Sequence, residues 1–267
     1  MERPSWAAAD IDLDRPSGAR VYDYFLGGAH NFAADRALAE AIAAMTPDIG
    51  DTMRANRAFL RRAVRFLTDQ GVTQFLDIGS GIPTVGNVHE IARQVDPSAR
   101  VVYVDVDPVA VSHSRAILGE DPHTTVLEGD ARDVEGIVHH PETRRLLDFD
   151  RPIAVLVLGV LHFVPDTDDP AGIVARLRDA VCPGSFVALV NVTHEGQPPE
   201  VVEAQKLSSR TDTPIFLRSR EELAAQFAGL ELVEPGLVHI PQWRPDSPLD
   251  VDDRPERFGA LAGIARR

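Results

Sequence analysis

The chain has 267 residues, 44% of them hydrophobic and 25% charged, which is typical of a globular protein with one large α/β domain. Its net charge of −14 disfavours binding to nucleic acid or anionic membranes, and no apolar run is long enough to span a membrane. The single cysteine, Cys182, excludes internal disulfides and cysteine metal clusters, and without a signal-peptide core we expect a cytoplasmic location.

A mostly helical pattern of about 70 residues precedes the first predicted strand. Residues 1–16 carry prolines and acids without periodicity and are predicted to form a loose arm. We expect residues 1–72 to form a helical extension or lid on a domain that spans residues 73–267. The predicted helices are a short one capped by Ser17 and stopped by Gly27 and Gly28, a second capped by Asn31 over residues 32–45, and a third over residues 51–70. The basic cluster in this third helix, Arg61, Arg62 and Arg65, is interpreted as a solvated face.

A short apolar run, residues 75–78, leads into Gly79 and Gly81, and an amphipathic stretch over residues 84–95 follows. Strand, glycine turn and helix in this order are typical of the start of a nucleotide-binding βαβ unit. The glycines allow a ligand to approach the backbone closely, and N–H groups of the first helical turn then point at it. An ordinary strand-to-helix turn is the structural alternative.

Two residues help to decide which class of ligand this turn would bind. Thr84 stands where the G-x-G-x-x-G fingerprint of dinucleotide sites has its third glycine. Asp77 lies two residues before the first glycine, where dinucleotide sites usually have an apolar residue. Both differences disfavour an NAD(P)-dependent oxidoreductase, which we keep as an alternative.

An acid also ends the second predicted strand, Arg100–Asp105. Asp105 follows Asp77 by 28 residues, and a carboxylate at this strand tip accepts hydrogen bonds from both hydroxyls of a ribose. Asp107 is the second acid there, and its position before a proline is typical of a helix cap. We favour Asp105 for the ribose, with capping as the alternative for both.

The third predicted strand, Thr124–Glu128, is followed by Asp130 and Ala131. Asp130 is a candidate for a hydrogen bond with the amino group of adenine, and Ala131 would leave room for the ring. A solvated turn acid is the alternative for Asp130.

A near-continuous apolar run over residues 152–159 predicts a fourth strand that is buried on both faces of a parallel sheet. His162 follows it, beside the crevice where open sheets bind ligands. The unperturbed pKa of imidazole suits a general base near neutral pH, so His162 is the candidate catalytic residue. A structural role is the alternative. We interpret the acids at residues 166–169 as a solvated loop and helix cap, and we expect no metal site.

Repeated strand–helix units predict an open α/β sheet that is mostly parallel and has helices on both faces. We expect about seven strands with an antiparallel last one. The remaining predicted helices are Pro108–Leu118, pieces within 131–147, one opened by Asp169, one near 199–209, and 220–227 with a capping box of Ser219 and Glu222. The remaining predicted strands are 185–192, 230–233, 237–240 and 258–265.

The acid before the glycine pair resembles the first motif of class I S-adenosylmethionine (SAM) methyltransferases, which have a Rossmann-like fold. More narrowly, the sequence resembles a family of S-adenosyl methyltransferases from high-GC bacteria that was long carried as a domain of unknown function. The resemblance covers nearly the whole chain from residue 15, with Gly159 and its flanks as a mild departure. The stretches that carry it are 20–28 with Asn31, Phe32, Asp35 and Arg36, then 56–60, 74–84, 160–163, 235–238 and 243–245.

The resemblance implies SAM as the cofactor and assigns candidate residues by position. Asp77, Gly79, Ser80 and Gly81 would line its methionine end, Asp105 would take the ribose, and Val106, Asp130 and Ala131 would border the adenine, with Asp107 and Gly159 as further cofactor-site candidates. Tyr22, Tyr24, Asn31 and Arg57 are candidates for the SAM carboxylate or the acceptor; we assign Tyr22 and Arg57 to the cofactor and Tyr24 and Asn31 to the substrate. Helix packing and capping are the alternatives for these four.

The resemblance does not identify a methyl acceptor. The chain lacks an N/D-P-P-Y/F motif after the fourth strand, which disfavours methylation of exocyclic base nitrogens, as does the negative charge. We therefore expect a small-molecule acceptor and neither nucleic acid nor membrane as a partner, and we leave a homodimer open. The alternative from another functional class is a SAM-binding sensor or scaffold without turnover.

Overall fold

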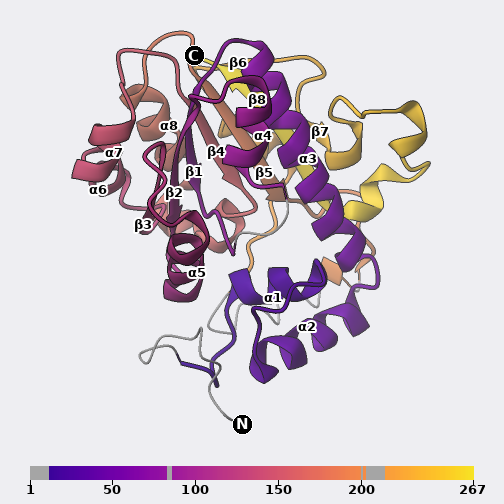
Figure 1. The fold of residues 1–267 in the computed structure, drawn as a ribbon. Helices are drawn as coiled ribbons and strands as arrows, with labels where there is room; N and C mark the ends of the chain where they lie inside the picture. The colour runs from indigo at the N-terminus through magenta and orange to yellow at the C-terminus, as the bar shows by residue number, and fades with distance from the viewer. Residues whose placement is uncertain (1–11, 83–85, 200, 203–213) are drawn as a thin grey trace.

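The structure is a computed structural model that describes residues 12–267 apart from 83–85, 200 and 203–213. Helices cover both faces of a central sheet (Figure 1). The strands are β1 Gln74–Ile78, β2 Arg100–Asp105, β3 Thr124–Glu128, β4 Ala154–Leu158, β5 Phe186–Val192, β6 Glu231–Leu232, β7 Val238–His239 and β8 Ala260–Arg266. The α-helices are α1 Gly18–Phe25, α2 Ala33–Met45, α3 Ile49–Asp69, α4 Val88–Val95, α5 Pro108–Leu118, α6 Val134–Val138, α7 Pro141–Leu146, α8 Pro170–Ala180 and α10 Arg220–Ala225.

The sheet has the strand order β3-β2-β1-β4-β5-β8-β6, with β7 also paired to β8. The first five strands are parallel, and β8 is antiparallel to β5. The short strands β6 and β7 pair with different parts of β8 and together fill one edge position. This confirms the predicted sheet of about seven strands, mostly parallel and with an antiparallel last strand.

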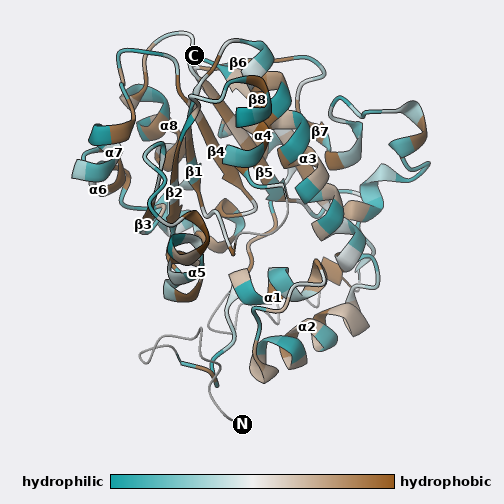
Figure 2. Ribbon diagram, in the orientation of Figure 1, coloured by the Kyte–Doolittle hydropathy of each residue, from teal (hydrophilic) through white to brown (hydrophobic). Residues whose placement is uncertain are grey.

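Both faces of the central strands are buried, which explains their continuous apolar sequence. Side chains alternate between the two faces along each strand. Phe75 of β1 packs in the core that includes α3 and α4, whereas Leu76 and Ile78 pack in the core that includes α6, α7 and α8. Figure 2 shows hydrophobic strands between helices with hydrophilic outer surfaces.

The N-terminal helices have two different positions relative to the sheet. α1 and α2 lie beyond the carboxyl ends of the strands, and α3 runs along one face (Figure 1). Phe59, Val64 and Leu67 of α3 are fully buried and belong to the same core as Phe75. The helical segment is therefore anchored on the sheet through α3. In the described part of the chain, no helix combines the length and the apolar character needed to cross a membrane.

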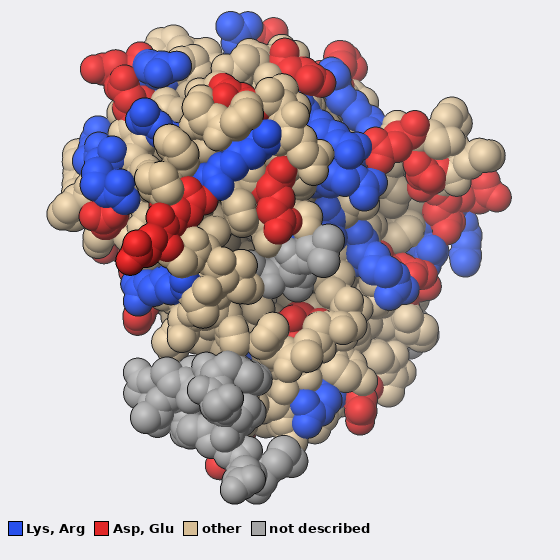
Figure 3. Space-filling view, viewed as in Figure 1, with Lys and Arg blue, Asp and Glu red and all other residues tan. Residues whose placement is uncertain are grey.

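Arg62 corrects the prediction of a wholly solvated basic face on α3. Arg61 is exposed and forms an ion pair with Asp246, and basic side chains gather over α3 beside acidic ones in Figure 3. Arg62 is buried instead, and its guanidinium donates hydrogen bonds of 2.9 Å to the carbonyls of Ile240 and Trp243. A guanidinium offers five N–H donors, and Arg62 uses two of its nitrogens on the backbone of the C-terminal segment, where the Trp243 N–H is a second donor to the Ile240 carbonyl at 3.3 Å.

Ser17 and Asn31 do not cap their helices as predicted. Ser17 is the N-cap residue of α1, but its hydroxyl donates to the carboxylate of Asp107. The N-cap residue of α2 is Phe32, whose backbone N–H donates to the Asp35 carboxylate at 2.7 Å. Both residues are able to cap a helix, but neither side chain binds a backbone N–H of the helix that follows it.

Other helix predictions have different outcomes. The helix expected from Thr84 begins at Val88, and residues 83–85 lie outside the described part of the chain. The helix expected near 199–209 also lies mostly outside it. The capping box of Ser219 and Glu222 is present at the start of α10 and is confirmed.

Replacing Arg62 with leucine removes its hydrogen bonds to two carbonyl groups, of which that of Ile240 keeps the Trp243 N–H as a donor. We expect Arg62→Leu to lower the free energy of unfolding by about 2–4 kcal/mol. The matched variant Arg61→Leu removes an exposed ion pair and should change it by less than about 1 kcal/mol. Urea unfolding followed by circular dichroism measures both values. Equal losses in the two variants would contradict the role of Arg62.

Candidate functional site

The turn after β1 is fixed against the end of β2. The backbone N–H groups of Gly79 and Ser80 both donate to the carbonyl of Val104, at 2.8 and 3.1 Å. Gly79 and Gly81 have φ angles of +73° and +66°, which residues with a Cβ rarely adopt. A Cβ on Gly79 would also collide with the side chain of Val160, which follows β4. Glycine is therefore required at residue 79 by both backbone conformation and close packing.

The carboxylate of Asp105 faces this glycine turn. One of its oxygens accepts a hydrogen bond from the N–H of Gly81 at 2.7 Å, and the other accepts one from the N–H of Asp107 at 2.8 Å. Each carboxylate oxygen has a further lone pair, so Asp105 keeps acceptor capacity for a ligand. This geometry fits the predicted ribose contact, which stays a prediction.

Asp77 at the end of β1 and Arg57 of α3 line a hollow beside the turn, together with Ser80 and Gly81. The hollow holds about 10 Å³ of free space, roughly the room for one water molecule. Burial raises the pKa of Asp77 to about 7, with Arg57 opposing the rise and Asp105 adding to it. Burial likewise raises the pKa of Asp105 to about 6. Two carboxylates with raised pKa values therefore lie at one site.

Val106 and Asp107 continue from Asp105 into the loop before α5. Val106 is 66% exposed, so its side chain is open to contact with a ligand ring. One carboxylate oxygen of Asp107 caps α5 by accepting from the N–H of Val109 at 2.8 Å, and the other accepts from Ser17. Asp107 therefore caps a helix, as the alternative interpretation of this residue had it. The position of Val106 fits the predicted border of the adenine.

Asp130 lies at the end of β3, where it was predicted, but its carboxylate already has a partner. The guanidinium of Arg132 donates to it at 2.9 and 3.0 Å and also reaches Asp168 at 3.1 Å. The bond from Arg132 lowers the pKa of Asp130, and an adenine amino group would have to share this carboxylate. Ala131 is buried beneath the loop. Within the described ranges, no group of three or more His, Cys, Asp or Glu side chains is arranged to hold a metal ion.

Residues of α1, α3 and the loop after β4 meet at Gly159. The Asn56 amide nitrogen donates to the Tyr22 hydroxyl at 3.1 Å. A Cβ on Gly159 would lie 3.8 Å both from that amide nitrogen and from the Cε1 atom of His162. Asn56 and His162 thus lie at the carboxyl end of β4, next to the glycine turn of β1, and Tyr22 is linked to this place through Asn56.

His162 belongs to a short 3₁₀ turn, η1 Leu161–Phe163, and is buried. Its Nδ1 atom has no hydrogen-bond partner among the described residues. Burial, reinforced by the charge of Arg218, lowers the pKa of His162 to about 3, so the ring is neutral at physiological pH. Arg218 also fixes the turn by donating to the carbonyls of Leu161 and Val164 at 2.8 and 2.6 Å. A neutral imidazole accepts a proton, but a pKa this low makes it a weaker base than free histidine.

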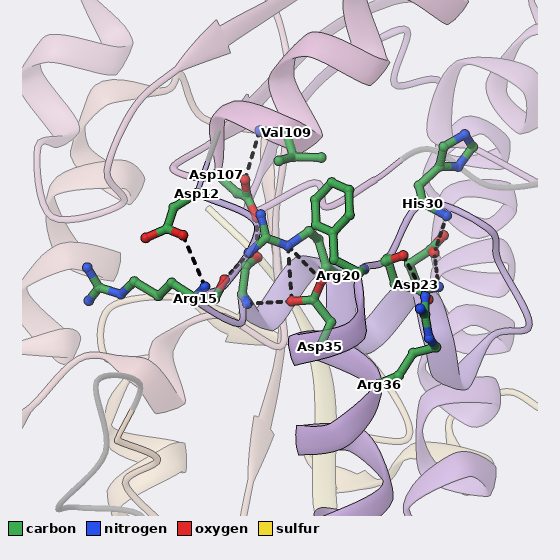
Figure 4. Close-up of polar contacts among 12 residues, drawn as sticks. Asp12, Arg15, Arg20, Asp23, His30, Asp35, Arg36, Asp107 and Val109 are labelled. Carbon is green, nitrogen blue, oxygen red and sulfur yellow. Dashed lines mark hydrogen bonds and ion pairs between the residues drawn. The ribbon is translucent and has the colours of Figure 1, made fainter. Parts of the chain in front are cut away.

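Residues 20–36, which include the N-terminal stretch of the family resemblance, are linked to one another by polar contacts (Figure 4). The buried guanidinium of Arg20 pairs with the buried carboxylate of Asp35 at 3.0 Å. The carboxylate of Asp23 accepts hydrogen bonds of 2.9 Å from the backbone N–H of His30 and the side chain of Asn31. These contacts join α1, the following loop and α2 into one unit.

The two predicted substrate residues belong to this unit. The Asn31 amide nitrogen donates to Asp23 and to the Gly28 carbonyl, and its amide oxygen accepts from Arg36 at 3.0 Å. The Tyr24 hydroxyl lies 3.5 Å from the Glu40 carboxylate in an exposed contact. The structure gives both side chains partners within the N-terminal helices and does not bring either of them to Gly159.

Sequence reasoning missed Asn56 and Val160 as site residues. Asn56 precedes Arg57 in the stretch 56–60 that carries the resemblance, and this adjacency was the available signal. No local pattern marks Val160, because its contact with Gly79 depends on β1 and β4 being neighbours in the sheet.

Replacing Asp77 with asparagine tests the cost of the buried carboxylate. A folded-state pKa of about 7, above the unfolded value, means that the folded protein is stabilised by the bound proton at low pH and loses this contribution as pH rises through 7. We expect Asp77→Asn to be more stable than the wild type at pH 8, by at most about 4 kcal/mol, and the gain to shrink at pH 5. Urea unfolding at both pH values without ligand measures this gain. A gain in stability that does not depend on pH would contradict the raised pKa of Asp77.

Three comparisons place the chain among known proteins. It matches, over residues 4–267, the model of a protein family described as S-adenosyl methyltransferase. A candidate methyltransferase of known crystal structure from Thermobifida fusca YX is 42% identical, with 99% of both chains covered and a TM-score of 0.92. A DUF574 family protein from Streptomyces avermitilis MA-4680 is 40% identical over 96% of this chain and 99% of that chain, with a TM-score of 0.91. No curated protein matches the sequence.

A more distant structure shares only the fold. Magnesium protoporphyrin IX methyltransferase from Synechocystis PCC 6803, solved with bound S-adenosylhomocysteine (SAH), is 14% identical over 92% of this chain and 93% of that chain, with a TM-score of 0.55. The family model and the two relatives at 40% identity or more span nearly the whole length, so this chain belongs to the S-adenosyl methyltransferase family formerly described as DUF574.

Proposed function

We propose that this protein transfers the methyl group of SAM to a small-molecule acceptor. The observation that carries the proposal is the Asp105 carboxylate, which the N–H of Gly81 holds at 2.7 Å across the ends of β1 and β2. This arrangement places an acceptor pair for ribose hydroxyls directly beside a glycine turn that a ligand can approach. Family membership supports SAM as the ligand and leaves the oxidoreductase alternative without support.

The residues of the site fit the parts of this cofactor. The remaining lone pairs of Asp105 would accept from the ribose, and the exposed side chain of Val106 would contact the adenine. Asp77 and Arg57 would lie at the methionine end, where they line the hollow. The hollow has room for about one water molecule in this structure, so the amino-acid end of the cofactor would have to widen it, and the nucleoside would extend over the exposed side chain of Val106.

SAM, when bound, supplies a methyl group that its sulfonium already activates. The chain has to align the acceptor and exclude water, and alignment of this kind is worth about 7–11 kcal/mol in model reactions. Tyr22 and Asn56 cover the carboxyl end of β4 and would shape the space for the acceptor. The neutral ring of His162 would accept the proton of a hydroxyl acceptor, whereas an amine or carboxylate acceptor would need no base.

The charge of the chain supports a small-molecule acceptor over nucleic acid. The net charge is −14, and acidic and basic side chains are interspersed on the face shown in Figure 3. A nucleic-acid methyltransferase needs basic residues that neutralise phosphates, and binding then depends on them.

The test begins with calorimetric titration of SAM, SAH and NADH, followed by incubation with methyl-labelled SAM and a cell extract. We expect binding of SAM and SAH, no binding of NADH, and label in the small-molecule fraction. Label in nucleic acid alone would contradict the acceptor class. Equal binding of SAM and SAH with no transfer to any fraction would favour the sensor alternative, and absence of SAM binding would contradict the proposal as a whole.

The raised pKa values of Asp77 and Asp105 predict a pH-dependent preference for SAM over SAH. SAM carries a sulfonium cation that SAH lacks, and a cation favours ionised carboxylates. As pH rises through about 6 and 7 both groups ionise, so the preference for SAM should increase by about threefold or more between pH 5.5 and 8. Calorimetry at the two pH values measures it, with Asp77→Asn as the control that reduces the increase. A preference that is constant with pH would contradict this electrostatic account.

A further inference from the structure

We propose that Asn56 and Arg57, consecutive residues of α3, together recognise the zwitterionic amino-acid end of the cofactor. Arg57 would bind the carboxylate, and the amide oxygen of Asn56 would accept a hydrogen bond from the α-ammonium group. The inference rests on the proposed binding of SAM and makes α3 a part of the cofactor site.

The orientation of the Asn56 amide follows from its neighbours. The Met53 carbonyl can only accept, so the Tyr22 hydroxyl, 3.2 Å away, donates to it. The Tyr22 oxygen then accepts from the Asn56 amide nitrogen at 3.1 Å. The amide oxygen is therefore directed away from Tyr22. It is shielded from solvent and has no hydrogen-bond partner among the described residues.

A shielded acceptor without a partner is costly, because it has lost its hydrogen bonds to water and gained none. A bound ligand that brings an N–H or O–H donor to Asn56 would remove this cost. The charged donor of an ammonium group would do so more strongly than a neutral one.

Arg57 presents the complementary group. A terminal nitrogen of its guanidinium donates to the Asn87 side chain at 2.8 Å. Its Nε atom is shielded from solvent and has no hydrogen-bond partner in the part of the chain that the structure describes. A guanidinium with an unused N–H binds carboxylates through charge-assisted hydrogen bonds.

Both side chains reach the adjoining ends of β1 and β4, which are paired in the sheet. Arg57 lines the hollow with Asp77 and the glycine turn, and the Asn56 amide nitrogen lies 3.8 Å from the position of a Cβ on Gly159. A simple anion would use Arg57 alone and leave Asn56 without a donor. A group with a carboxylate and an ammonium on one carbon satisfies both residues.

The test compares variants of the full chain with SAH and three analogues: SAH without its amino group, SAH without its carboxylate, and 5′-methylthioadenosine, which lacks the amino-acid portion. We expect Asn56→Leu to weaken binding of SAH and the decarboxylated analogue by about 10- to 100-fold, and to leave the deamino analogue within about threefold. Arg57→Met should weaken SAH and the deamino analogue by a similar factor and leave the decarboxylated analogue within about threefold. Calorimetry measures all of these dissociation constants.

Unchanged binding of 5′-methylthioadenosine shows that the nucleoside site of each variant is folded. Arg61→Met is the matched control on α3, because Arg61 is exposed and pairs with Asp246, and it should leave all four affinities unchanged. Variants of Asn56 and Arg57 that respond alike to all four ligands, or that keep their SAH affinity, would overturn the inference alone. A wild-type protein that binds none of the ligands would overturn the proposed function and the inference with it.

Discussion

The site depends on two carboxylates, Asp77 and Asp105, that are buried at the ends of adjacent strands. Removing a carboxylate from water is unfavourable unless hydrogen bonds or a cation compensate for it. Asp105 accepts a hydrogen bond from the N–H of Gly81. This N–H reaches the carboxylate only because the turn contains residues that adopt positive φ. Asp77 is compensated by the charge of Arg57 only in part, since burial still raises its pKa to about 7. The glycine turn and the position of α3 thus both serve the same pair of acids, and a cationic ligand would complete their compensation.

The N-terminal stretch over α1 and α2 also buries charged side chains, and these pair with one another. Arg20 and Asp35 are both buried, and each would be strongly destabilising without the other. Asp23 is also buried, and a Cβ on Gly28 would collide with its carboxylate, so the loop after α1 has to carry glycine there. Several polar residues of this stretch therefore have partners within it, and the predicted ligand contacts of Tyr22, Tyr24 and Asn31 stay predictions. The contacts within the stretch join α1 to α2 at the carboxyl ends of the strands.

Much of the fold and part of the site could be predicted because their determinants are local. Parallel strands end at one edge, so an acid after β2 and a glycine turn after β1 had to meet, and the Asp105–Gly81 contact confirms that they do. The partners of polar residues on helices are not local. Neither the burial of Arg62 nor the contacts of Asn31 could be derived from spacing, because both partners lie on other elements. Asp130 is an intermediate case, since its partner Arg132 is two residues away and was open to prediction.

The N-terminal segment contacts the rest of the protein through two surfaces of very different strength. α3 buries Phe59, Val64 and Leu67 completely in the core of the sheet, and burial of each such side chain contributes roughly 1.5–3 kcal/mol. α1 contacts the rest of the protein through smaller groups: the hydroxyl of its N-cap residue Ser17 donates to Asp107, Ala19 packs against a buried cluster that includes Val109 and Ala110, and Gly18 lies near the half-exposed ring of Phe163. Local opening requires less free energy where few apolar contacts are broken. α3 therefore holds Arg57 at the carboxyl ends of the strands through its core contacts, whereas the orientation of the Asn56 amide also depends on Tyr22 of α1.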